Sequence, residues 1–184
     1  MLPMYMEAIS RSDADLMVEA ATRGIRAHPG NALHWRYRGV ARQMLGNGLK
    51  AKGEDPSGPY GEALSDLDTA IRLLPGAADA RLDRAQLRVN WAGARGTSRE
   101  AAVARFTQAV ADCDAAEKID PTHARVWWLR GMARWNWGSL QSSFSQDPSE
   151  PLCGAFEDFG KVEELAPSRL DVVLQRSGAY HQFA

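Results

Sequence analysis

Four stretches of the sequence end in proline and resemble one another: GIRAHP (24–29), AIRLLP (70–75), AEKIDP (116–121) and VEELAP (162–167). Each of these prolines stands 46 residues after the previous one. The residues before each proline carry apolar side chains at spacings of three and four, as an amphipathic helix does. Because proline cannot continue a helix, each stretch predicts a helix end. A fixed period of this length indicates stacked copies of one supersecondary unit.

The period divides the 184 residues into repeats of one expected all-α domain. The expected parts are an N-terminal half repeat at 1–29, full repeats at 30–75, 76–121 and 122–167, and a C-terminal capping helix at 168–184. Stacked repeats contact only their neighbours, so helices with polar outer faces must cap the ends. The expected architecture is therefore a solenoid of helical hairpins, with three full repeats and a half repeat at each end.

Each full repeat contains two helix patterns separated by an insert. The first helices are expected at 31–46, 77–92 and 123–138. The inserts GNGLKAKGEDPSGPYG and GSLQSSFSQDPSEP are rich in glycine, serine and proline and predict loops, whereas SREAAVARFTQAVADCDAAEKI predicts one long helix. Inserts of equal length but unlike sequence favour longer helix pairs over three separate functional loops. The pattern leaves open where helix gives way to loop within 46–61, 92–98 and 138–151.

The composition is that of an ordinary globular protein, with 45% hydrophobic and 24% charged residues. The net charge of −1 gives no general electrostatic reason to bind nucleic acid or an anionic membrane. Two cysteines do not form a disulfide framework. The sequence shows no apolar run long enough to span a bilayer and no signal-peptide pattern, so we expect a cytoplasmic protein without a membrane partner.

Motifs that carry catalysis or hold cofactors are missing from the sequence. The four histidines follow no metal-ligand spacing. There is no phosphate-binding GxxxxGK[ST] loop, no GxGxxG fingerprint and no GxSxG elbow. We therefore expect no enzyme activity, no metal site and no cofactor.

Charged residues recur in register with the prolines. One arginine column consists of Arg38, Arg84, Arg130 and Arg176. A second arginine column consists of Arg42, Arg88 and Arg134. An aspartate column on the second helices consists of Asp66, Asp112 and Asp158. These arginines could bind phosphate or an acidic peptide, but arginine and aspartate columns on stacked helices favour a structural ladder of ion pairs, which suits the planar guanidinium.

Small residues follow the first arginine column, at Gly39, Ala85, Gly131 and Ser177. They predict that another helix passes close by at this point. The pattern of aromatic, small and apolar residues resembles the tetratricopeptide repeat (TPR). In the first full repeat the matching residues are Trp35, Gly39, Ala63, Leu67, Ala70, Leu73 and Pro75. In the third they are Trp127, Gly131, Ala155, Phe159, Val162, Leu165 and Pro167.

The middle repeat departs from this pattern because Arg81 replaces the aromatic residue. The repeat length also departs: the family repeat is about 34 residues long, against 46 here. The resemblance places Trp35 and Trp127 in the core, and we expect Trp91 and Trp137 to be buried between repeats.

TPR domains line a concave groove with their first helices, and the resemblance implies a right-handed superhelix with such a groove. Carried over position by position, the expected partner-binding residues are Arg36, Tyr37, Met44, Leu82, Gln86, Asn90, Arg125, Trp128, Met132, Trp135 and Asn136. The version of the family that clamps the carboxylate of chaperone tails has Asn or basic residues where this chain has Val40, Asp83 and Leu129. That clamp is therefore not expected here, and the aromatic patch of Trp128, Met132 and Trp135 becomes the expected anchor.

Three functions are compatible with this reading. The first is an adaptor that binds a peptide or a partner helix in the groove. The second is a structural module that associates with itself through its terminal helices, because the segment 168–184 is apolar. The third, a helical-repeat RNA binder, is motivated by the arginines and opposed by the matching aspartates and the net charge. Some aromatic groove residues could alternatively pack against the C-terminal helix.

Overall fold

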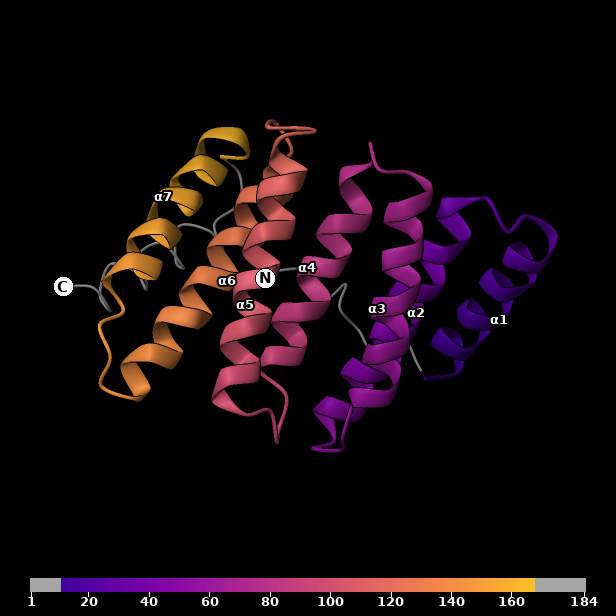
Figure 1. The fold of residues 1–184 in the computed structure, drawn as a ribbon, viewed down its shortest axis with the longest axis horizontal. Helices are drawn as coiled ribbons and strands as arrows, with labels where there is room; N and C mark the ends of the chain where they lie inside the picture. Colours follow the sequence, from indigo (N-terminus) through magenta and orange to yellow (C-terminus); the bar gives the residue numbers. More distant parts are fainter. Residues whose placement is uncertain (1–10, 168–184) are drawn as a thin grey trace. The chain divides into compact units, whose positions relative to one another are not determined.

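The computed structural model describes residues 11–167, and within them every regular element is a helix (Figure 1). The helices are α1 (Arg11–Ala27), α2 (Ala32–Ala51), α3 (Ser57–Leu73), α4 (Ala78–Ala92), α5 (Arg99–Glu117), α6 (Ala124–Ser143) and α7 (Ser149–Leu165). The expected all-α fold is confirmed. The expected capping helix at 168–184, which includes Arg176 and Ser177, lies outside the described residues.

The helices form two compact units. The first contains α1, α2 and α3 together with the short segment Ala94–Gly96. In it, α2 packs against both α1 and α3. The second contains α4 to α7. Here each helix packs against the next one along the chain, and α4 also contacts α6. Both units are thus built from helices that pair with their sequence neighbours.

The 46-residue period is visible in the helix starts. The first helices of the repeats begin at Ala32, Ala78 and Ala124, which stand at equivalent positions. Two second helices begin at equivalent serines, Ser57 and Ser149. The helix α5 is the exception, because Ser98 caps it four residues earlier, its side chain accepting a hydrogen bond from the Ala101 N–H at 3.2 Å.

The first and third inserts are helical over most of their length, so their interpretation as loops was wrong, whereas the expectation of longer helix pairs is confirmed. The helices α2 and α6 continue to Ala51 and Ser143, so both are 20 residues long. Only five residues separate each from the next helix, because Pro56 and Pro148 occupy the N-cap position of α3 and α7. Proline is tolerated at the start of a helix, where its missing N–H has no intrahelical partner. The long helix expected in the second insert is confirmed as α5.

The extended helices add a layer to the core, in which a small residue on the first helix faces a large one on the second. A methyl group added to Gly46 would lie 2.4 Å from the ring of Tyr60, and one added to Gly138 would lie 2.7 Å from Leu152. Ala92 packs in the same way against Phe106. These positions are equivalent in the three repeats. Gly46 and Gly138, which indicate a loop by composition, are therefore glycines because a backbone and a side chain approach closely at these two positions.

The close approach predicted from the column of small residues is confirmed at two positions. A methyl group added to Gly39 would meet Leu67 at 2.9 Å, and one added to Gly131 would meet the Phe159 ring at 2.6 Å. Leu67 and Phe159 are both fully buried. The middle repeat uses Ala85 here, which is buried in the core of the second unit. This column fixes the distance between the two helices of each hairpin.

Ser145, which lies just after α6, has a strained backbone conformation. Gly53 and Ser145 stand at equivalent positions after α2 and α6, and both have positive φ angles, of 75° and 54°. The N–H of the next residue returns to a helix carbonyl in each case, from Glu54 to Leu49 and from Gln146 to Gln141, both at 3.0 Å. This is the Schellman arrangement, which favours glycine.

Replacing Ser145 with glycine is therefore expected to raise the free energy of unfolding by about 0.5–1 kcal/mol. The gain comes from removing the steric cost of a side chain at positive φ. Urea denaturation of the wild type and the variant measures it. A loss of stability would show that the Ser145 side chain contributes a contact worth more than the strain.

Candidate partner-binding surface

The arginine and aspartate columns meet inside each helical hairpin, as the ladder hypothesis predicts. In the first full repeat, Arg38 donates from Nε and Nη2 to the two carboxylate oxygens of Asp66, at 2.8 and 2.6 Å. Arg42, one turn further along α2, donates to the same carboxylate at 2.5 Å. The carboxylate of Asp66 is almost fully buried. One aspartate thus holds two arginines of the neighbouring helix.

The same trio recurs in both other repeats. Arg84 and Arg88 both donate to Asp112. In the third repeat the trio consists of Arg130, Arg134 and Asp158. Arg130 Nε lies 3.0 Å from Asp158 Oδ1, and Arg134 Nη1 lies 2.7 Å from Asp158 Oδ2. All six arginines of the two columns are therefore engaged within their own hairpins, as a structural ladder requires.

The electrostatic environment keeps these arginines charged. The hydrogen bond to Asp66 raises the pKa of Arg38 above its usual value. Burial opposes the charge of Arg130, but bonds to Asp158 on α7 and to Asp114 and Glu117 on α5 outweigh it and raise its pKa. Arg130 therefore joins α5, α6 and α7 within the second unit. Three acidic partners offset the cost of burying the Arg130 charge.

The regularly spaced prolines Pro29 and Pro121 also take part in this arrangement. The indole N–H groups of Trp35 and Trp127 donate to the carbonyl oxygens of Pro29 and Pro121, at 2.8 and 3.0 Å. Arg38 stacks over the Trp35 ring at 4.9 Å, and Arg130 stacks similarly over Trp127. Each tryptophan thus links the turn before its helix to an arginine of the ion pairs. Both side chains are half-buried, whereas the sequence predicted that they lie in the core. The constant spacing of six residues between proline and tryptophan is the signal that could have revealed this.

In the first unit, the expected groove residues lie on a partly open apolar face of α2. Tyr37 is 50% exposed, and Leu33, one turn before it, is 45% exposed. Val40 and Met44 continue the stripe and are half-buried. The spacing of 33, 37, 40 and 44 places these four side chains on one face of the helix. We call these residues the α2 apolar face. Arg36, the remaining expected residue here, is half-buried beside it.

In the second unit, the prediction that Leu82 is a groove residue is wrong. Leu82 is fully buried, and it packs in a core that includes Val126 and Leu129 of α6. The physical reason is that α4 packs against α6, which covers this part of α4. Asp83 is buried as well and accepts a hydrogen bond at 2.7 Å from Arg125, another expected groove residue. The residues at the chaperone-clamp positions 83 and 129 are thus part of the interior.

The other expected residues of the second unit are half-buried and engaged with neighbours. Gln86 donates to Asn90 at 3.1 Å, and Asn136 donates to the Met132 carbonyl at 2.7 Å. Trp128 and Trp135 pack on Phe159, with ring centroids 5.9 and 6.3 Å away. Together with Met132 they form a partly buried layer over the core residues of α7. The residues of the expected aromatic patch therefore lie together and stabilise the last hairpin.

Two further properties concern the described part of the chain. Among residues 11–167, no group of His, Cys, Asp and Glu side chains has an arrangement that could hold a metal ion. Over the same residues, no helix combines the length and apolar character needed to cross a membrane.

The two cysteines differ in their surroundings. Cys113 is buried, and burial raises the pKa of its thiol, whereas Cys153 is exposed.

Comparison with known proteins identifies the fold. No family model matches the sequence, and no curated protein matches it. Among solved structures, the first TPR domain of human RPAP3 is 17% identical, with a TM-score of 0.54, over 78% of this chain and 91% of that one. A thermophilic TPR protein of Thermus thermophilus is 16% identical, with a TM-score of 0.55, over 92% and 91%. The first TPR of Spaghetti (RPAP3), bound to the HSP90 peptide SRMEEVD, is 18% identical, with a TM-score of 0.51, over 79% and 93%.

At these identities the likeness shows the fold. The chain has the fold of TPR domains.

Proposed function

We propose that this protein is a protein-interaction module that binds a peptide or a helix of a partner protein through the first helices of its repeats. The α2 apolar face carries the proposal. Leu33 and Tyr37 are each about half exposed to solvent. They stand one turn apart on the same face of α2, so their exposed apolar surfaces are adjacent. Contiguous exposed apolar residues of this kind favour a site of association, and tyrosine is a common anchor of interfaces.

Apolar contacts, and not charge, should dominate the binding. The six arginines of the two columns are held by Asp66, Asp112 and Asp158. An RNA or a polyanionic peptide would have to compete with these buried carboxylates. The chaperone-tail ligand seen in one structural neighbour is also not expected, because this chain places Val40, Asp83 and Leu129 at its clamp positions. The proposed partner is therefore a segment with apolar side chains, and the protein acts by binding rather than by catalysis.

Site-specific photo-crosslinking tests the proposal. A benzoylphenylalanine residue placed at position 37 is expected to form a covalent adduct with a partner in cell extract from the source organism. The matched control carries the same residue at position 65 on α3, where Ser65 is exposed, and it should give no such adduct. Equal labelling from both positions, or none from position 37, would argue against the α2 apolar face as the binding surface.

The same experiment separates the alternatives. A crosslink between two copies of this chain would indicate self-association, which sedimentation of the purified protein would then confirm. A crosslink that disappears on ribonuclease treatment would indicate that RNA carries the interaction. A partner protein retained after ribonuclease treatment supports the adaptor function.

A further inference from the structure

An apolar segment precedes the first helix of the chain. Residues 1–10 read MLPMYMEAIS and lie outside the described residues. Their only charged side chain is Glu7, and large apolar side chains stand at positions 1, 2, 4, 5, 6 and 9. Apolar side chains gain about 25 cal/mol for each Å² that they remove from water. A segment of this composition therefore favours contact with an apolar surface within its reach.

The described residues of the first unit offer one such surface. Their exposed large apolar residues are Leu16, Leu33, Tyr37 and Leu74. Leu16 stands three residues from an acidic residue in both directions along α1. Leu74 lies just after the end of α3. Leu33 and Tyr37 are neighbours on one helix face, and the α2 apolar face is therefore the extended apolar surface of this unit.

The packing of α1 on α2 brings the start of α1 close to one end of this face. A methyl group added to Gly24 would lie 2.8 Å from the ring of His34, and Arg38 Nη1 lies 3.5 Å from Thr22 Oγ1. The two helices run antiparallel, because an earlier residue of α1 meets a later residue of α2. Continued to the first residue of α1, this register ends about one turn of α2 beyond the α2 apolar face.

The α2 apolar face also borders the side of α2 that packs on α1. His34 and Arg38, which contact α1, directly follow Leu33 and Tyr37. One residue turns a helix by about 100°, so the two stripes of side chains are adjacent. Gly39, which faces α3, follows Tyr37 by two residues and so points about 200° away. A segment that leaves the start of α1 thus reaches the α2 apolar face without crossing α3.

The segment is long enough to cover the face. From the start of α1 to Leu33, the path along α2 is about 15 residues, or about 22 Å. Ten residues of extended chain reach about 33 Å. Because the segment is joined directly to α1, its effective concentration at the face is roughly millimolar. A contact that would be weak between separate molecules is therefore sufficient to hold it there.

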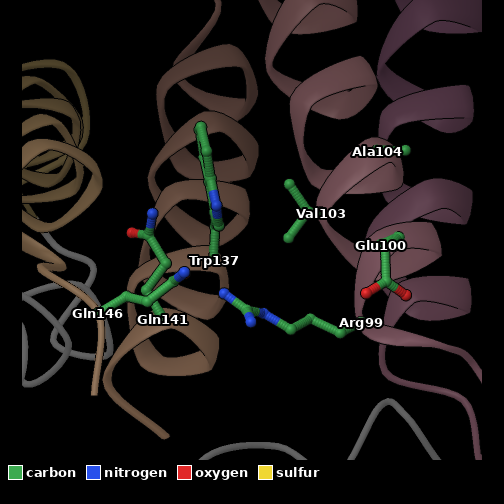
Figure 2. A pocket seen from close by; sticks show the side chains of 7 residues that line it. All are labelled: Arg99, Glu100, Val103, Ala104, Trp137, Gln141 and Gln146. Atoms are coloured by element: carbon green, nitrogen blue, oxygen red, sulfur yellow. The ribbon is translucent and has the colours of Figure 1, made fainter. Parts of the chain in front are cut away.

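The second unit contains another partly apolar surface. It is a hollow between the start of α5 and the end of α6, lined in part by Val103 and Trp137 (Figure 2). Figure 2 shows the charged side chain of Arg99 extending from α5 toward α6 at this hollow. The segment continues directly into α1, which shares the first unit with the α2 apolar face. The connection of the chain therefore favours the α2 apolar face over the hollow.

We propose that residues 1–10 occupy the α2 apolar face when no partner is bound, and that a partner binds by displacing them. This inference rests on the proposed function, because it assigns a regulator to the same surface. The segment acts as a competitor built into the chain. It lowers the apparent affinity for a partner by the fraction of molecules in which the face is covered.

Photo-crosslinking within the purified full chain tests the contact without any partner. Benzoylphenylalanine in place of Tyr5 keeps an aromatic group at that position. We expect an adduct of monomer mass that joins position 5 to residues 33–44, with a yield independent of protein concentration. Leu33→Ser/Tyr37→Ser should lower this yield about five-fold or more, because it removes the exposed apolar surface. Leu16→Ser, the matched control on α1, should leave the yield unchanged.

Three results of this experiment would overturn the proposal. They are an adduct of dimer mass, an adduct confined to residues outside 33–44, and the absence of an adduct. An adduct with residues 33–44 whose yield is the same in Leu33→Ser/Tyr37→Ser would overturn it as well, because the contact would then not depend on the apolar face.

A second measurement tests the displacement. In the full chain, Met4→Asp/Met6→Asp places two charges in the segment. It should raise the affinity for the partner crosslinked at position 37 about five-fold or more, because more molecules then have an open face. Unchanged affinity would overturn the proposed displacement. If position 37 labels no partner in either chain, the proposed function fails, whereas the adduct from position 5 still decides whether the segment occupies the face.

Discussion

Replacing Asp158 with asparagine is expected to lower the free energy of unfolding by about 3–5 kcal/mol, the cost of removing one partner from a buried ion pair. Asp158 is 2% exposed and accepts hydrogen bonds from Arg130 and Arg134. Asparagine has nearly the same shape, so the loss reports the charge and not the packing. Two guanidinium groups would remain in the hairpin without their main counter-ion. Urea denaturation followed by tryptophan fluorescence measures the loss.

The neighbouring residue provides a matched control. Glu157 precedes Asp158 on α7 but is exposed, so Glu157→Gln makes the same change in charge one position away. It should change stability by no more than about 0.5 kcal/mol. Replacing Arg84 with methionine should have an intermediate effect, because Arg88 still donates to Asp112. Equal effects of Asp158→Asn and Glu157→Gln would show that the arginine and aspartate columns do not stabilise the protein as a ladder of ion pairs.

Replacing Gly46 with alanine is expected to destabilise the protein by about 1–3 kcal/mol, the usual cost of overpacking a core. This result runs against helix propensity, which favours alanine over glycine by about 0.8–1 kcal/mol. The new methyl group would lie 2.4 Å from the Tyr60 ring. That ring is fully buried and its hydroxyl is fixed by a bond of 2.6 Å to Asn47. The ring has no room to retreat, so the backbones of α2 and α3 must separate.

Gly48 lies two residues further along the same helix and gives the opposite prediction. No atom lies within 4 Å of a methyl group placed there. Gly48→Ala should therefore raise the free energy of unfolding by about 0.5–1 kcal/mol, through helix propensity alone. Thermal or urea denaturation of the two variants side by side checks both signs. A gain in both would mean that residues 46–51 do not pack as an extension of the hairpin.

The repeat period, the fold and the ion pairs could be predicted from the sequence. Each of them depends on residues that recur at equivalent positions in several repeats. Arg130 and Asp158 are recognisable as a pair only because their equivalents recur at the same interval. The sequence predicted longer helix pairs, but it did not show which residues of the first and third inserts are helical, for a physical reason. Glycine and proline, which stand at positions 46 and 56, are common in loops. Composition does not distinguish a glycine in a turn from Gly46, which faces Tyr60. The distinction depends on a tertiary contact.

The candidate site was less predictable than the fold. Leu82 and Trp128 stand at equivalent positions, yet Leu82 is fully buried and Trp128 is not. Equivalence in a repeat specifies which face of a helix a residue occupies, but the next helix decides whether that face is covered.

We propose that partner binding depends on the α2 apolar face and not on the arginine columns. The most direct measurement is the affinity for the partner crosslinked at position 37, compared between the wild type and a Leu33→Ser/Tyr37→Ser variant at low and high salt. The variant is expected to bind at least about tenfold more weakly, as loss of interface anchors implies, with little dependence on salt. Unchanged binding by the variant, together with an affinity that falls by orders of magnitude in high salt, would contradict this proposal, because binding through arginines to an anionic partner depends on salt in that way.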